Sequence, residues 1–119
     1  MNTQLPDASV TMEISPEAVA EWISLPPEER PRVIDCREED ELGICRISGH
    51  EWVPLGLFPG ARETLQARNE RGVVVYCHHG VRSLRATQFL RSIGVEKAFS
   101  MKGGIEDWSV RIDPAVARY

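Results

Sequence analysis

The sequence predicts an α/β fold in which about five strands form a parallel sheet with helices on both faces. Short apolar, β-branched runs alternate along the chain with stretches of helical periodicity, which is typical of strand–helix–strand units with right-handed crossovers. The run Val73–Tyr76 is hydrophobic without alternation, as expected of a central parallel strand that is covered on both faces. The 119 residues, of which 42% are hydrophobic and 27% charged, predict one domain over 1–119 with its own core.

Three strands and two helices are predicted before this central strand. Alternating apolar and polar residues predict a strand over 10–14, and Ser15 followed by Pro16 is typical of a helix N-cap and first turn. Pro26 and Pro27 end that helix. Further strands are expected over 33–35 and 52–53, and a modest helix from Phe58 or Pro59 to Arg68.

An amphipathic helix is predicted shortly after the central strand, and Gly94 ends it. Its apolar positions are spaced three and four residues apart: Ala86, Phe89, Leu90 and Ile93. A last strand is expected over 95–100. Gly103 and Gly104 then form a turn that permits close backbone packing, and Trp108 in the following short helix is expected to be a core residue.

Cys77 lies between the central strand and the first turn of this amphipathic helix. The first helical turn has unpaired backbone N–H groups and the positive end of the helix dipole, so anions bind there. A free thiol has a pKa of about 8.5, but cysteines at helix N-termini and beside cations reach about 3.5–7.5. We expect Arg82 and the loop amides to lower the pKa of Cys77, and Gly80 to let the loop turn tightly. Cys77 is therefore the predicted nucleophile.

The length of the loop narrows the chemistry. Four residues separate Cys77 from Arg82, whereas tyrosine and dual-specificity phosphatases have five in the ring that cradles a tetrahedral phosphate. A shorter loop favours a smaller anion such as an outer sulfur atom. The residues expected to bind the substrate are His78, His79, Gly80, Val81, Arg82 and Ser83.

A second polar group follows the strand predicted over 33–35. The carboxyl ends of parallel strands share one edge of a sheet, so Asp35 and Arg37 are expected near Cys77. We interpret Asp35 and Arg37 as an ion pair that braces the loops, in a supporting and not a catalytic role. Cys36 and Cys45 are interpreted as small core or rim residues; Cys36 is alternatively a resolving thiol if its sulfur lies close to Cys77.

Three motifs, in this order and spacing, resemble those of the single-domain rhodanese family, sulfurtransferases whose cysteine carries a persulfide. They are Asp-x-Arg-Glu at 35–38, the cysteine loop at 77–82 and Gly-Gly-x-x-x-Trp at 103–108. The segment 39–60 departs from the family pattern. There Glu41, Ile47 and Gly49 match the family, while Cys45, Arg46, Ser48 and His50 replace its other landmarks.

The resemblance implies a rhodanese-like fold and a thiosulfate:cyanide sulfurtransferase type of activity. A sulfane sulfur from thiosulfate or a persulfide donor would pass to a thiophilic acceptor through a persulfide on Cys77, with no other cofactor. The chain's tail, with Arg111 and Tyr119, resembles rhodanese domains fused to adenylyltransferases that activate sulfur-carrier proteins, so such a carrier is a candidate acceptor. The physiological donor and acceptor, the oligomeric state, and which of His78 and His79 faces the persulfide stay open.

Two alternatives from other classes remain. The first is a non-enzymatic regulatory or sulfur-relay binding module, against which the presence of Cys77 argues. The second is a phosphatase or arsenate reductase, against which the loop length argues.

Composition restricts the partners and the location. The net charge of −4 and the isoelectric point near 5.4 argue against a sequence-independent nucleic-acid surface. No apolar run approaches membrane-spanning length and the first residues lack the features of a signal peptide, so we expect a cytoplasmic protein without a membrane partner. The three cysteines lack paired spacing, and the adjacent His78 and His79 lack further ligands at suitable spacing, so no metal is expected.

Overall fold

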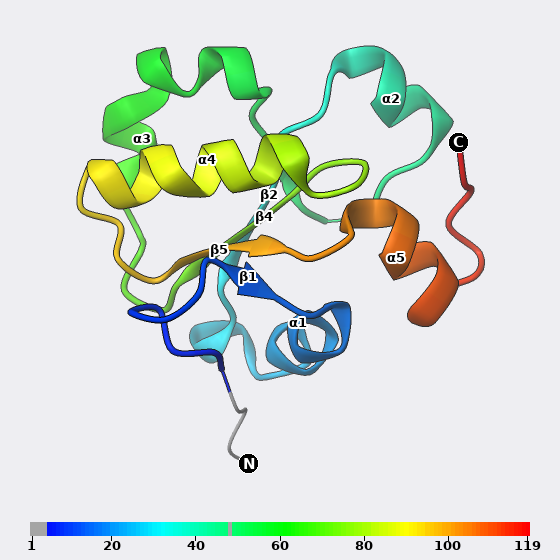
Figure 1. Ribbon diagram of the computed structural model, residues 1–119, viewed down its shortest axis with the longest axis horizontal. Helices are drawn as coiled ribbons and strands as arrows, with labels where there is room; N and C mark the ends of the chain where they lie inside the picture. Colours follow the sequence, from blue (N-terminus) through cyan, green and yellow to red (C-terminus); the bar gives the residue numbers. More distant parts are fainter. Residues whose placement is uncertain (1–4, 48) are drawn as a thin grey trace.

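The computed structural model describes residues 5–47 and 49–119, which form a five-stranded parallel sheet with helices on both faces (Figure 1). Ser48, one of the predicted departures from the family pattern, lies outside the described residues. In spatial order the strands are β1 (Glu13–Ile14), β5 (Ala98–Met101), β4 (Val73–Tyr76), β2 (Arg32–Asp35) and β3 (Glu51–Trp52). The predicted fold class is confirmed, and the valine-rich strand β4 lies at the centre of the sheet.

Helices cover each face of the sheet over a separate core. The helices are α1 (Pro16–Ile23), α2 (Glu39–Ile44), α3 (Arg62–Gln66), α4 (Val81–Ser92) and α5 (Gly104–Arg111), with 3-10 turns at Pro27–Glu29, Leu55–Leu57 and Pro59–Ala61. On one face α3 and α4 pack on Val73 and Val75, and on the other α1 and α5 pack on Val74 and Phe99. Successive residues of β4 therefore enter opposite cores, which explains why the strand is apolar without alternation.

Local signals placed several elements correctly. The Ser15 hydroxyl accepts the N–H of Ala18 at 3.1 Å and so caps α1, with Pro16 as its first residue. Trp108 is buried in the core beneath α5, as predicted. Within the described part of the chain no helix is both long and apolar enough to cross a membrane.

Other predicted boundaries were wrong. The first strand is only Glu13–Ile14, because a turn closed on the carbonyl of Asp7 leaves Val10 exposed. Strand β3 begins one residue before the predicted range, and β5 begins at Ala98 because Val95 still donates to Leu90 at the end of α4. Helix α3 is shortened by the 3-10 turn Pro59–Ala61. Helix α2, in the loosely patterned segment 39–60, had not been predicted.

Candidate active site

Cys77 follows the last residue of β4, and its sulfur lies inside the tight loop that leads into α4. The Sγ atom accepts the backbone N–H of Gly80 at 3.1 Å and that of Ser83 at 3.3 Å. Gly80 adopts a φ of +107°, a left-handed conformation that side chains rarely tolerate, and this turns its N–H towards the sulfur. The predicted tight turn at Gly80 is therefore present, and it forms a cradle around one atom.

The surroundings of Cys77 favour its thiolate form. The pKa of Cys77 is lowered to about 5, first because of the neighbouring Cys36 thiol. Burial opposes this shift, while the hydroxyl and N–H of Ser83 and the N–H of Gly80 reinforce it. At neutral pH the group is therefore an anion, and it is held by neutral donors.

Two buried hydroxyl groups lie behind the loop. Ser83 Oγ lies 3.4 Å from Cys77 Sγ and 2.7 Å from Oγ of Ser100, which comes from strand β5. Both serines are fully buried, and each reaches the carbonyl of Gly80. Sequence reasoning missed Ser100; the available signal was one hydroxyl within a strand whose other residues are apolar.

The start of α5 fixes the loop from the other side. Gly104 has a φ of +63°, and a side chain there would collide with the carbonyls of Cys77 and His78. These two carbonyls accept the N–H groups of Ile105, at 2.8 Å, and Glu106, at 3.1 Å. The expected close packing of the two glycines near the loop is thereby confirmed.

Aromatic rings form the rim of the site. The half-buried ring of His78 stacks between that of His79 and that of Tyr119, each at a centroid distance of 3.8 Å. His79 and Val81 are exposed at this rim. The predicted loop residues thus divide into a buried part that holds the sulfur and an outer part that an incoming molecule meets.

Asp35 and Arg37 form the expected ion pair. The fully buried Arg37 donates to Asp35 through Nη2 at 2.7 Å and through Nε at 2.9 Å. Its remaining N–H groups reach the carbonyl of Cys45 at 2.7 Å and the hydroxyl of Tyr119 at 3.0 Å. Arg37 therefore ties β2, the end of α2 and the C-terminal segment together, in the predicted supporting role.

Arg82 has a partner that was not predicted. Its guanidinium binds the carboxylate of Glu41 through two hydrogen bonds, one of them 2.8 Å long, and does not donate to Cys77. The Tyr119 hydroxyl donates to the same carboxylate at 2.6 Å. The pKa of Glu41 is lowered to about 2, chiefly by Arg82. The Arg82 charge still interacts with that of Cys77, as expected, but the pKa of Cys77 is lowered chiefly by Cys36, Ser83 and Gly80.

Glu41 and Tyr119 were not predicted as parts of the site. They are 78 positions apart in the sequence, and Tyr119 reaches Glu41 because the C-terminal segment runs beside α2 (Figure 1). The sequence signals for them were the family match at Glu41 and the resemblance of the tail that ends at Tyr119. In the structure the Glu41 side chain also accepts the Glu38 N–H as part of a capping box at the start of α2.

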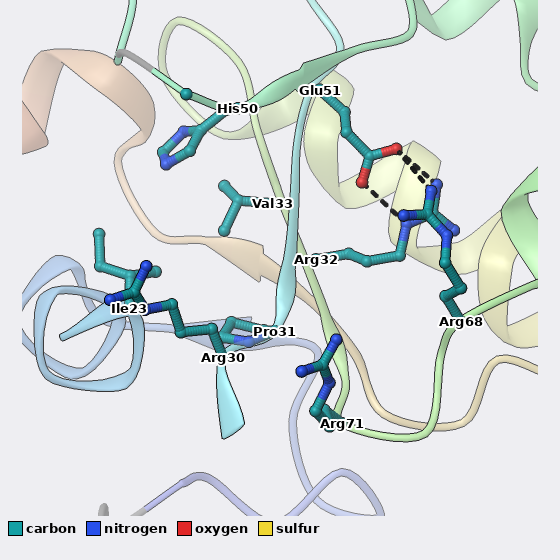
Figure 2. Close-up of a pocket in the computed structure, with 10 residues that line it drawn as sticks. Ile23, Arg30, Pro31, Arg32, Val33, His50, Glu51, Arg68 and Arg71 are labelled. Atoms are coloured by element: carbon teal, nitrogen blue, oxygen red, sulfur yellow. Dashed lines mark hydrogen bonds and ion pairs between the residues drawn. The ribbon is translucent and has the colours of Figure 1, made fainter. Parts of the chain in front are cut away.

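A separate hollow of about 410 Å³ lies at the other end of β2. Four arginines line it: Arg30, Arg32, Arg68 and Arg71. Figure 2 shows the Glu51 carboxylate facing the guanidinium groups of Arg32 and Arg68, with dashed contacts to both. No cysteine lines this hollow, and it is separated from Cys77 by the length of the strand.

This fold, with a cysteine loop between the central strand and a helix, defines a rhodanese-like protein. The chain belongs to the rhodanese-like domain family, whose model matches residues 15–111. A probable adenylyltransferase/sulfurtransferase of Mycobacterium tuberculosis, MoeZ, is 28% identical over 106 residues, which cover 89% of this chain and 26% of MoeZ. A tRNA uridine(34) hydroxylase of Mesorhizobium japonicum is 35% identical over 92 residues, covering 74% of this chain and 30% of the hydroxylase.

A solved structure shows the same fold over the whole domain. The rhodanese-related protein of Thermoplasma volcanium superimposes with a TM-score of 0.75 at 25% identity, covering 92% of this chain and all of that one. The match thus extends over all of that solved chain, whereas this chain spans under a third of the two curated relatives.

Proposed function

We propose that this protein is a sulfurtransferase that carries a sulfane sulfur as a persulfide on Cys77. The observation that supports this most is the loop around Sγ, in which two backbone N–H groups and one hydroxyl surround a single buried sulfur. Such a cradle stabilises an anionic sulfur with dipoles that are already in place. Membership of the rhodanese-like family supports the same activity.

The reaction has two displacement steps. The Cys77 thiolate attacks the outer sulfur of thiosulfate; a new S–S bond forms, and the donor's S–S bond breaks as sulfite leaves with the electron pair. A nucleophilic acceptor then attacks the outer sulfur of the persulfide, and Cys77 leaves as a thiolate. The lowered pKa of about 5 favours both steps, because the nucleophile needs no separate base and the leaving group needs no acid.

The proposed donors are thiosulfate or a small persulfide, and the proposed acceptors are a thiophile such as cyanide or a sulfur-carrier protein. The exposed rim at His79 and Val81 lets a flexible tail approach the loop. The relative MoeZ, a probable adenylyltransferase/sulfurtransferase, supports sulfur transfer, and the resemblance of the chain's tail supports a sulfur-carrier acceptor. The hydroxylase relative indicates that this domain also occurs in proteins with other activities. A direct assay of sulfur on Cys77 is therefore needed.

The test is to incubate the reduced protein with thiosulfate, remove the donor, and measure cyanide-labile sulfur and intact mass. We expect one added sulfur atom per chain, released by cyanide, and none on Cys77→Ser. Cys45→Ser is the matched control, because Cys45 contacts Arg37 outside the loop, and it should load as the wild type does. Sulfur on the Cys77→Ser variant, or none on the wild type, would refute the proposal.

The two alternatives predict other outcomes in the same preparation. A non-enzymatic regulatory module would gain no sulfur, and a sulfur-relay module would gain none from thiosulfate. A phosphatase would turn over an aryl phosphate in a manner that depends on Cys77.

A further inference from the structure

Cys36 and Cys77 occupy matching positions on neighbouring parallel strands. In the register of β2 and β4, Asp35 pairs with Tyr76, and the Cys36 N–H extends this ladder by donating to the Tyr76 carbonyl at 3.0 Å. Adjacent strands lie about 4.7–4.9 Å apart, and the Cα atoms of disulfide-bonded cysteines are usually about 4.4–6.8 Å apart. The backbone separation therefore suits a disulfide between the two residues.

The two side chains also face the same way. Both belong to the core beneath α3 and α4, in line with Ile34 on β2 and with Val75 on β4. The pKa of Cys36 is raised, first by its interaction with Cys77 and then by burial. The pair is thus a thiol beside a thiolate, on neighbouring strands of one core.

Burial limits what Cys36 can meet. Cys36, like Cys77, is 1% exposed, and it lies in the core cluster that includes Phe58 and, at its margin, Leu55. Its one sulfur neighbour within this core is Cys77. Cys45 lies on the other face of the sheet and has its sulfur 3.9 Å from Arg37 Nη1.

We propose that Cys36 is a resolving thiol that forms a disulfide with Cys77 after a hydroperoxide has oxidised Cys77. In the first step the Cys77 thiolate attacks one peroxide oxygen; an S–O bond forms, the O–O bond breaks, and the leaving hydroxide takes up a proton to become water. In the second step the Cys36 sulfur attacks the sulfenic sulfur of Cys77. The S–S bond forms, the S–O bond breaks, and the Cys36 proton leaves with the hydroxide as water.

The two thiols together supply the two electrons that reduce one hydrogen peroxide to two waters. The disulfide removes the Cys77 nucleophile until a dithiol reduces it. It also removes the sulfenic acid before a second peroxide converts it irreversibly to sulfinic acid. Cys36 would then make the site a reversible dithiol–disulfide couple, whether or not sulfur transfer is its main activity.

The experiment exposes the reduced full chain to hydrogen peroxide, alkylates the free thiols, and maps the peptides by mass spectrometry. We expect a Cys36–Cys77 disulfide, alkylated Cys45, and full recovery of both thiols with dithiothreitol. In Cys36→Ala we expect sulfinic and sulfonic acid on Cys77 that dithiothreitol does not reverse. Cys45→Ala should behave as the wild type does.

The wild-type map tests the proposal even if Cys36→Ala is unstable, and Cys36→Ser, which keeps the side-chain size, serves as a second variant checked by circular dichroism. Sulfinic acid on wild-type Cys77 at the rate seen in the Cys36 variants would overturn the proposal. So would a disulfide that joins Cys77 to Cys45.

Discussion

Arg32 is the first residue of strand β2 and Arg37 lies two residues after its last, and both are buried arginines that bind one carboxylate. Arg32 donates to Glu51 at 2.7 and 2.9 Å, and Arg37 donates to Asp35 at 2.7 and 2.9 Å. Each arginine also donates to backbone carbonyls. Arg32 donates to the carbonyls of Thr64, Leu65 and Ala67, and Arg37 donates to that of Cys45 at 2.7 Å.

The two ion pairs differ in what surrounds them. The Glu51 side chain is 36% exposed beside the open hollow of Figure 2, whereas that of Asp35 is 3% exposed. Arg37 also binds Tyr119, and through it the ion pair reaches Glu41 and the mouth of the cysteine loop. The same pairing therefore stabilises the scaffold at the amino end of the strand and supports the candidate site at its carboxyl end.

The largest effect is expected from Arg37→Ala. It leaves Asp35 buried without its partner, and breaking a buried ion pair costs about 3–5 kcal/mol of unfolding free energy. Urea unfolding measures the loss. Arg37→Lys keeps the charge without the planar fork, so it should recover only part of the stability.

A smaller loss is expected from Arg32→Ala, about 1–3 kcal/mol by urea unfolding, because water can reach Glu51 while three carbonyls lose their donor. Alkylation of Cys77 should be unchanged in this variant. Arg71→Ala, in the same hollow but exposed, is the matched control and should change the stability by no more than about 0.5 kcal/mol. Equal losses of unfolding free energy in Arg32→Ala and Arg37→Ala would contradict the proposed difference between the two ion pairs.

The smallest effect is expected from Glu41→Gln, about 0.2–1 kcal/mol at neutral pH, because its pair with Arg82 is partly exposed. The pKa of Glu41 is lowered from 4.5 to about 2, so its contribution is present above pH 4.5 and is lost as the pH falls through about 2. The wild type should therefore lose its advantage over Glu41→Gln across that interval in urea unfolding. An advantage that stays constant with pH would contradict the role of the Glu41 carboxylate.

The features predicted correctly from the sequence are local ones. Strand β4, the turn at Gly80 and the start of α4 are contiguous, and the conformation of each is set by nearby residues. Asp35 and Arg37 are two positions apart in the sequence, at the end of a strand that the sequence predicts. These elements could be predicted because the residues that determine each conformation or contact are close together in the sequence.

The features that were missed depend on distant parts of the chain. The partner of Arg82 is 41 positions away, so the sequence could not show that its charge is neutralised by Glu41. Ser100 reaches Ser83 because β5 lies next to β4, and a strand order cannot be read from one strand. The position of Cys36 beside Cys77 depends on the register of two strands, so the sequence left their proximity as a condition.

The most direct test of this account is the rate at which iodoacetamide alkylates Cys77 as a function of pH, followed on the Cys77 peptide. We expect the rate to rise with a midpoint near pH 5, because the Cys36 thiol, Ser83 and the Gly80 N–H stabilise the thiolate. A midpoint near the ordinary thiol value of about 8.5 would contradict the account, because Cys77 would then not be activated by its loop.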